Sequence, residues 1–213
     1  MKLIFLHGLG QSPDDWQQVI NELPISDTFS VELFSGIFQR DSVNLHVLNH
    51  KINTILAEVK EPFVLCGLSL GAVLALQQAI MKSPFLKGIV VSAPQFESPN
   101  TLLMTIQNIV FHFMPKKSFQ NLGLTKKQLI ELVNSMKSLN LKEEIHTVTI
   151  PTLILCGSKD RVNLSAAKEL SSIMGNATLK IISNGSHELN RDRPKEFAKA
   201  LEEFMHVHIL TNE

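Results

Sequence analysis

The sequence lacks the features that mark several classes of protein. Its formal net charge is zero, so no excess of charge favours nucleic acid or an anionic membrane surface as a partner. No apolar run approaches the roughly 18 residues that a membrane-spanning helix needs. Residues 1–6 are too short an apolar stretch for a signal peptide and are interpreted as a strand. The only two cysteines, Cys66 and Cys156, fall near the ends of predicted buried strands. We expect both to be reduced thiols, in keeping with a cytoplasmic protein.

Short apolar segments alternate with helical patterns along most of the 213 residues, without an internal repeat or a flexible linker. This organisation predicts a single domain spanning residues 1–213. The predicted strands cover residues 3–6, 29–34, 63–66, 88–92, 152–156 and 179–182. Repeated strand–helix units indicate an α/β fold with a mostly parallel, doubly wound sheet of about six strands. Ligands of such sheets bind at the carboxyl ends of the strands.

The helices between these strands differ in character. A helix is expected at about 41–60 with one apolar face, and another from about 165 to 174. The segment 70–81 is nearly all apolar, which predicts a buried helix rather than one lying on the surface. A final helix carries apolar residues on one face, namely Phe197, Leu201, Phe204 and Met205.

The alternation stops between residues 95 and 150, where only helical patterns occur. Thr125 followed by Gln128 is typical of a capping box at the start of a helix. This segment is predicted to be a helical insertion into the domain. Its apolar side chains could form a wall of a substrate pocket or could simply pack the insertion onto the core. The candidates for the pocket are Met104, Phe111, Phe113 and Met114.

A Gly-x-Ser-x-Gly motif is the strongest chemical signal in the chain. Gly67, Ser69 and Gly71 lie directly after an apolar strand and directly before an apolar helix. The two glycines permit a tight strand-to-helix turn that would crowd a Cβ atom. Such a turn presents the serine hydroxyl at the carboxyl end of the sheet and at a helix N-terminus, where developing negative charge is favoured. The motif therefore predicts that Ser69 is a nucleophile.

A serine hydroxyl needs a base to take its proton, and the base needs an orienting partner. Asp160 follows the fifth predicted strand and His187 follows the sixth, so both fall at the same sheet edge as Ser69. Asp160 could instead only cap the next helix, although a cap near Asn163 or Leu164 explains that helix better. Asp41 is a fallback candidate for the acid.

These motifs, in the order Ser, Asp, His, resemble those of a small α/β-hydrolase with a helical cap, and the resemblance covers essentially the whole chain. The family carries His-Gly after this first strand, and His7-Gly8-Leu9-Gly10 matches it. The resemblance implies an oxyanion hole formed by the backbone N–H groups of Leu9 and Leu70. It also implies that residues 95–150 are the cap, and that no metal or organic cofactor takes part.

The sequence departs from the family pattern at three places. The two strands that commonly precede the His-Gly strand are missing, which shortens the expected sheet to about six strands. An Asp-x-x-Gly-x-Gly-x-Ser signature is absent after the second strand. Ala72 stands where a further glycine often follows the turn. These differences affect the subfamily and the substrate rather than the predicted triad.

The resulting hypothesis is a serine hydrolase that cleaves a small carboxylic ester or thioester through an acyl-serine intermediate. The same triad could act on a C–C, lactone or amide bond, or transfer an acyl group to an alcohol. A non-catalytic ligand-binding protein on the same scaffold is a further alternative. His46 and His50 have a spacing that could suit a metal, but a solvated helix face is the better interpretation. His7 is expected to position the loop after the first strand. The sequence leaves the oligomeric state open.

Overall fold

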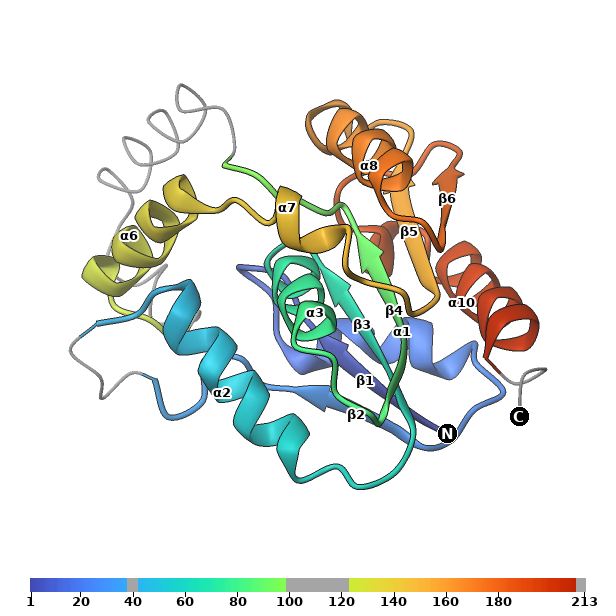
Figure 1. Ribbon diagram of the computed structural model, residues 1–213, viewed down its shortest axis with the longest axis horizontal. Helices are drawn as coiled ribbons and strands as arrows, with labels where there is room; N and C mark the ends of the chain where they lie inside the picture. Colours follow the sequence, from blue (N-terminus) through green and yellow to red (C-terminus); the bar gives the residue numbers. More distant parts are fainter. Residues whose placement is uncertain (38–41, 99–122, 210–213) are drawn as a thin grey trace.

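The computed structural model describes residues 1–37, 42–98 and 123–209. Its centre is a six-stranded sheet with strand order β2-β1-β3-β4-β5-β6, in which every neighbouring pair is parallel (Figure 1). The strands are β1 (Lys2–Leu6), β2 (Thr28–Val31), β3 (Phe63–Leu68), β4 (Leu86–Ser92), β5 (Thr152–Gly157) and β6 (Ala177–Ile182). The predicted six-stranded α/β fold is thus confirmed.

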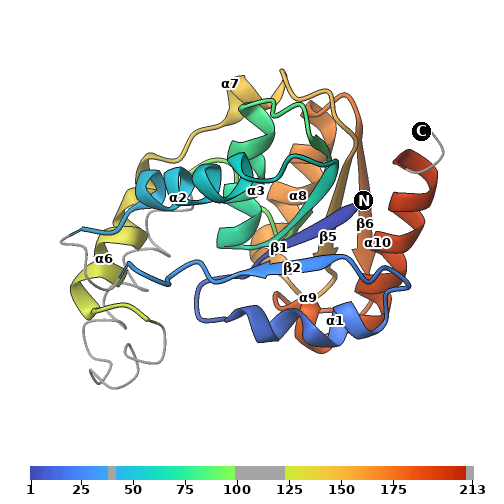
Figure 2. The same cartoon turned by 90° about the horizontal axis from the view of Figure 1, so that it is seen from below.

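Helices cover both faces of the sheet, as Figure 2 shows. The face against α2 (Leu45–Ala57), α3 (Leu70–Ile80) and α8 (Arg161–Ile173) buries the larger apolar cluster. The other face packs against η1 (Pro13–Trp16), α1 (Gln17–Asn21), α9 (Leu189–Asp192) and α10 (Pro194–His208). Covering both faces explains why the central strands are continuous apolar runs rather than alternating ones.

α3 is buried along most of its length, as its apolar sequence predicts. Nine of its eleven residues are buried, and it lies against both β3 and β4. α10 is the opposite case, because it buries one stripe that includes Phe197, Leu201 and Phe204 and leaves its other face in solvent. The difference follows from position, since α3 is covered by α2 and α7 (Lys142–Ile145) whereas α10 has nothing described on its outer side.

Two element boundaries differ from the sequence prediction. β2 ends at Val31, and the apolar residues Leu33 and Phe34 that follow are buried outside the strand. Their burial explains why the apolar pattern continues beyond the strand. α2 begins at Leu45, with Asn44 as its N-cap accepting a 2.9 Å hydrogen bond from the N–H of Val47. Residues 38–41, which include the fallback acid Asp41, lie outside the described part of the chain.

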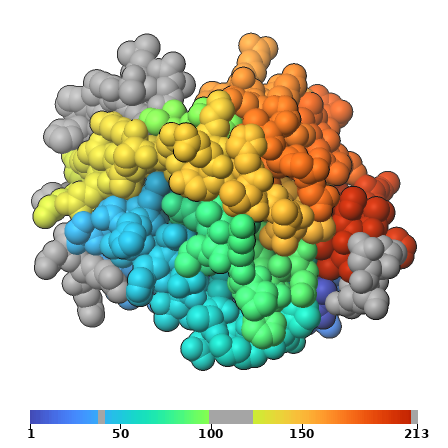
Figure 3. Space-filling view, viewed as in Figure 1, coloured from blue at the N-terminus to red at the C-terminus, as the bar shows by residue number. Residues whose placement is uncertain are grey.

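The described part of the insertion is helical. Thr125 and Gln128 form the predicted capping box at the start of α6 (Lys126–Ser135), with hydrogen bonds of 3.2 and 2.8 Å. η2 (Met136–Ser138) and α7 follow. α6 is fastened to the start of α2 by a 3.0 Å bond from the N–H of Leu45 to the hydroxyl of Ser135. In Figure 3 these yellow residues lie on the surface between α2 and α8. The pocket candidates Met104, Phe111, Phe113 and Met114 fall in 99–122, outside the described residues.

Candidate active site

The turn from β3 into α3 holds Ser69 in an unusual backbone conformation. Its φ of 54° and ψ of −110° are rare for a residue with a side chain and indicate local strain. A Cβ on Gly67 would lie 2.2 Å from the carbonyl oxygen of Gly71. A Cβ on Gly71 would lie 2.1 Å from that of Leu6. Both glycines are therefore required by close backbone approach, as the motif predicts.

The same close approach brings the loop after β1 against the turn. The Cβ position of Gly71 is also 2.9 Å from the carbonyl oxygen of His7, and that of Gly8 is 2.9 Å from a side-chain carbon of Leu68. Leu70 is the first residue of α3, so its N–H has no acceptor within the helix. The N–H of Leu9 has no acceptor among the described residues either. Neither predicted oxyanion donor thus has a hydrogen-bond acceptor among the described residues.

His7 is buried beneath this loop and is held by backbone groups. Its Nδ1 lies 2.9 Å from the carbonyl oxygen of Gly8, and its Nε2 accepts a 3.2 Å hydrogen bond from the N–H of Leu33. Accepting at Nε2 requires a neutral ring with its hydrogen on Nδ1. Burial lowers the pKa of His7, which agrees with that form. These contacts agree with the expectation that His7 positions the loop.

Asp160 and His187 meet at the carboxyl ends of β5 and β6. The Oδ2 of Asp160 lies 2.8 Å from Nδ1 of His187, so the ring can donate to the carboxylate from that nitrogen and keep Nε2 free. The acid is buried, with 5% of its side chain exposed, whereas 43% of the His187 side chain is exposed. A buried orienting acid behind an accessible imidazole is the arrangement that a general base requires.

Asp160 also caps α8, which corrects the prediction of a cap at Asn163 or Leu164. Its Oδ1 accepts a 3.3 Å hydrogen bond from the N–H of Asn163, and α8 begins at Arg161. Capping and orienting the base are compatible because the carboxylate has two oxygens, one for each task. The prediction treated them as alternatives, and the structure shows both.

Asn163 is a site residue that the sequence reasoning missed. Its Nδ2 lies 2.9 and 2.8 Å from the two oxygens of Asp160, and Gln95 hydrogen-bonds to its Oδ1. Burial alone would raise the pKa of Asp160, but hydrogen bonds from His187 and Asn163 outweigh burial and lower it. The spacing in the sequence could have identified this contact, because a side chain three positions after an N-cap residue can reach back to it. Asn163 thus adds to the effect of His187 in lowering the pKa of the buried acid.

Ser69 and His187 follow β3 and β6 at the same edge of the sheet. Ser69 is partly buried, and the described residues show no hydrogen bond between its hydroxyl and the ring of His187. Catalytic hydrogen bonds are often long in a ligand-free enzyme and shorten when substrate binds. The structure therefore brings Asp160 and His187 together directly and places Ser69 at the end of β3, which β4 separates from β5.

The other histidines and the cysteines considered above lack the surroundings of a metal ligand or a nucleophile. His46 and His50 lie exposed on α2, and the residues that the structure describes contain no cluster of three side chains able to hold a metal. Burial raises the pKa of the Cys66 thiol, and burial together with the charge of Asp160 raises that of Cys156 to about 12. Neither thiol is a nucleophile at neutral pH.

None of the helices in residues 1–37, 42–98 and 123–209 has the length and apolar character to cross a bilayer.

The parallel sheet, the strained serine turn and the acid–histidine pair are the framework of one enzyme class. The model of the "Alpha/beta hydrolase family" matches residues 3–200, and the chain belongs to this family. Among curated relatives, the mouse "Monoacylglycerol lipase ABHD6" is 28% identical over 112 residues. That match covers 52% of this chain and 31% of the mouse protein, so the chain matches about a third of that relative's length.

Other relatives match along the whole chain. A Haemophilus influenzae protein that carries the provisional name 2-succinyl-6-hydroxy-2,4-cyclohexadiene-1-carboxylate synthase is 25% identical, covering 95% of this chain and 96% of that protein. Among solved structures, MenH from S. aureus has a TM-score of 0.79 at 18% identity and covers 97% and 93% of the two chains. The enol-lactonase from Burkholderia xenovorans has a TM-score of 0.83 at 13% identity, with 96% and 91% covered. These two structures share the fold.

Proposed function

We propose that the chain is a serine hydrolase that cleaves small carboxylic esters or thioesters through an acyl-Ser69 intermediate. The observation that carries the proposal is the 2.8 Å contact between Asp160 and His187 at the same sheet edge as the strained Ser69 turn. A carboxylate that fixes the histidine tautomer has its clearest use in activating a hydroxyl nucleophile. The family membership supports the same class of reaction.

In the proposed mechanism, Ser69 attacks the carbonyl carbon while Nε2 of His187 takes the hydroxyl proton. The N–H groups of Leu9 and Leu70 stabilise the oxyanion that forms, and the loss of one such donor costs about 10²–10³ in kcat in comparable enzymes. His187 then gives its proton to the departing alcohol or thiol, leaving the acyl-enzyme. Water, deprotonated by His187, releases the acid and restores Ser69. Asp160 remains ionised throughout, helped by Asn163.

The test measures hydrolysis of p-nitrophenyl butyrate and labelling by a fluorophosphonate probe. Ser69→Ala is expected to lower kcat by about 10⁴-fold or more and to abolish labelling of the peptide that contains residue 69. Ser172→Ala is the matched control, because its exposed hydroxyl only bonds to the carbonyl of Glu169 on α8. Full activity and full labelling in the Ser69 variant would show that the proposal is wrong.

A second candidate is a synthase or lactonase reaction at the same residues. The full-length match to the Haemophilus protein favours it, since that relative aligns over 95% of this chain whereas the mouse lipase aligns over 52%. In that case His187 would still be the base, but the natural substrate would not be a simple ester. A panel of esters, thioesters and enol lactones separates the candidates by their kcat/KM values.

A further inference from the structure

A buried pair of amide side chains joins the loop after β1 to α9, the short helix that follows His187. Gln11 follows β1 and Asn190 lies in α9, 179 positions further along the chain. Nε2 of Gln11 donates to Oδ1 of Asn190 at 3.1 Å, and Nδ2 of Asn190 donates back to Oε1 of Gln11 at 3.2 Å. Gln11 is 6% exposed and Asn190 is fully buried. Two reciprocal bonds in a dry environment set one geometry for the pair.

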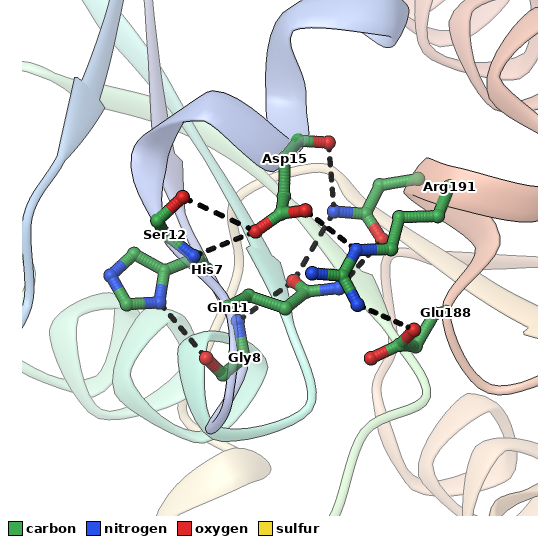
Figure 4. Close-up of polar contacts among 8 residues, drawn as sticks. His7, Gly8, Gln11, Ser12, Asp15, Glu188 and Arg191 are labelled. Carbon is green, nitrogen blue, oxygen red and sulfur yellow. Dashed lines mark hydrogen bonds and ion pairs between the residues drawn. The ribbon is translucent and has the colours of Figure 1, made fainter. Parts of the chain in front are cut away.

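Each amide also bonds to the backbone of the segment that follows β1. Oε1 of Gln11 accepts a 3.2 Å hydrogen bond from the N–H of Gly8, the residue directly before Leu9. Figure 4 shows Gln11 reaching back toward Gly8 in this way. Nδ2 of Asn190 donates a further 3.2 Å bond to the carbonyl of Asp15. Asn190 stands three residues after His187, so the pair connects the predicted oxyanion loop to the segment that carries the predicted base.

An ion-pair chain runs beside the amides and reaches solvent. Nε of Arg191 lies 2.6 Å from Asp15, whose other oxygen accepts a 2.7 Å bond from the N–H of Ser12, and Arg191 also contacts Glu188 (Figure 4). Arg191 is 43% exposed, and exposed ion pairs are weakened by water and salt. The buried amides are therefore the more rigid of the two connections.

We infer that Gln11 and Asn190 are positioning residues, which fix the separation between the N–H of Leu9 and the imidazole of His187. This inference rests on the proposed function. The oxyanion donor and the base act on one transition state from two loops, and neither loop alone determines the distance between them. The side-chain hydrogen bonds of the amide pair go to each other, to Gly8 and to Asp15, and none reaches Ser69 or His187. Loss of the pair therefore reduces the stabilisation of the transition state more than the binding of substrate. It should lower kcat by a larger factor than it raises KM.

The test compares Gln11→Ala, Asn190→Ala and the double variant on p-nitrophenyl butyrate. Each single change is expected to lower kcat about tenfold with KM within about twofold, and the double variant is expected to be no slower than the slower single variant. The matched control is the exposed amide pair Gln17 and Asn21, joined at 2.7 Å within α1. Alanine at either control position is expected to leave kcat unchanged.

An exchange of lengths distinguishes positioning from stability. Gln11→Asn shortens one partner by a methylene and Asn190→Gln lengthens the other, so the double exchange keeps the span. The double exchange is expected to have a higher kcat than either single exchange, when kcat is expressed per folded molecule. Three results would overturn the inference. They are decreases in kcat that add in the double alanine variant, decreases that stay within twofold, and decreases that match the loss of folded protein. If the wild type fails to label at Ser69, the proposed function itself is wrong, whereas normal labelling with unaffected amide variants refutes only the positioning role. If an alanine variant unfolds, the exchange set decides the matter.

Discussion

The Ser69 turn and the His187 segment reach the same edge of the sheet but are held there by different forces. The turn is fixed by contact between backbone atoms, since added Cβ atoms at Gly67 and Gly71 would overlap neighbouring carbonyls. The His187 side is held by hydrogen bonds: Nδ1 of His187 donates to Asp160, Asn163 donates to the same carboxylate, and Asn190 bonds to Gln11. Steric contact tolerates no substitution, whereas a hydrogen-bonded segment can be loosened one bond at a time.

The largest effect is expected from Asp160→Asn, which changes the hydrogen-bonded side without removing the helix cap. Asparagine is as good an N-cap as aspartate, so α8 should keep its stability. The amide cannot hold His187 in the productive tautomer, and kcat on p-nitrophenyl butyrate should fall by about 10⁴-fold. The exposed Asp14→Asn is the control and should leave kcat unchanged. A loss below about tenfold would refute the role assigned to Asp160.

The steric side is tested by Gly71→Ala. The new methyl group would lie 2.1 Å from the carbonyl oxygen of Leu6, and the backbone there cannot move without disturbing β1. We expect the free energy of unfolding to fall by about 3 kcal/mol, measured by urea denaturation. Gly175→Ala is the matched control, because nothing lies within 4 Å of its Cβ position. Equal stability of the two variants would show that the turn is not sterically fixed.

Asn163→Ala should give an intermediate effect that depends on pH. The pKa of Asp160 is lowered against the effect of burial by bonds that include those from Asn163, so removing them raises that pKa. The lowered pKa of Asp160 stabilises the folded state above the unfolded-state value of about 3.9, and this contribution is lost as pH falls. Asn163→Ala should therefore reduce the unfolding free energy more at pH 7 than at pH 3, measured by urea denaturation, with about a tenfold lower kcat near neutrality. Asn176→Ala, whose exposed amide bonds to the carbonyl of Thr149, is the control. An equal loss of unfolding free energy at both pH values would contradict this account.

The smallest effect concerns His7, which supports the oxyanion loop. Its pKa is lowered in the folded protein by burial, while the unfolded chain titrates near the ordinary value of about 6.5. Below that value the unfolded state binds a proton that the folded state does not. Stability is therefore fully present above about pH 6.5 and declines on acidification, by at most about 1.4 kcal/mol per pH unit.

The check is urea denaturation of the wild type and of His7→Gln between pH 7.5 and 5. As pH falls, the unfolding free energy of the wild type should decrease more than that of the variant, because glutamine does not titrate. Other titrating groups are common to both proteins and cancel in the difference. A difference that stays constant over this range would show that His7 is not held neutral.

The sequence predicts the steric features of this molecule better than the hydrogen-bonded ones. The glycines at positions 67 and 71 indicate that the backbone is crowded there. The run of apolar residues that forms α3 predicts that this helix is buried. By contrast, Asn163 and Gln11 each combine a partner three residues away with a distant one, which is Gln95 for Asn163 and Asn190 for Gln11. Their roles depend on distances that only the folded chain defines. The limits of β2 were overestimated for a related reason, since Leu33 and Phe34 are buried without being in a strand.

The burial of the two thiols has a practical consequence. Cys66 lies on β3 and Cys156 on β5, the two strands that flank β4, and neither is exposed. An alkylating reagent can reach them only when the middle of the sheet opens, so its rate of reaction under native conditions measures the frequency of that opening. The native sequence thus carries two internal reporters at the strands that support Ser69 and Asp160. They allow local unfolding beside the site to be followed without introducing any label.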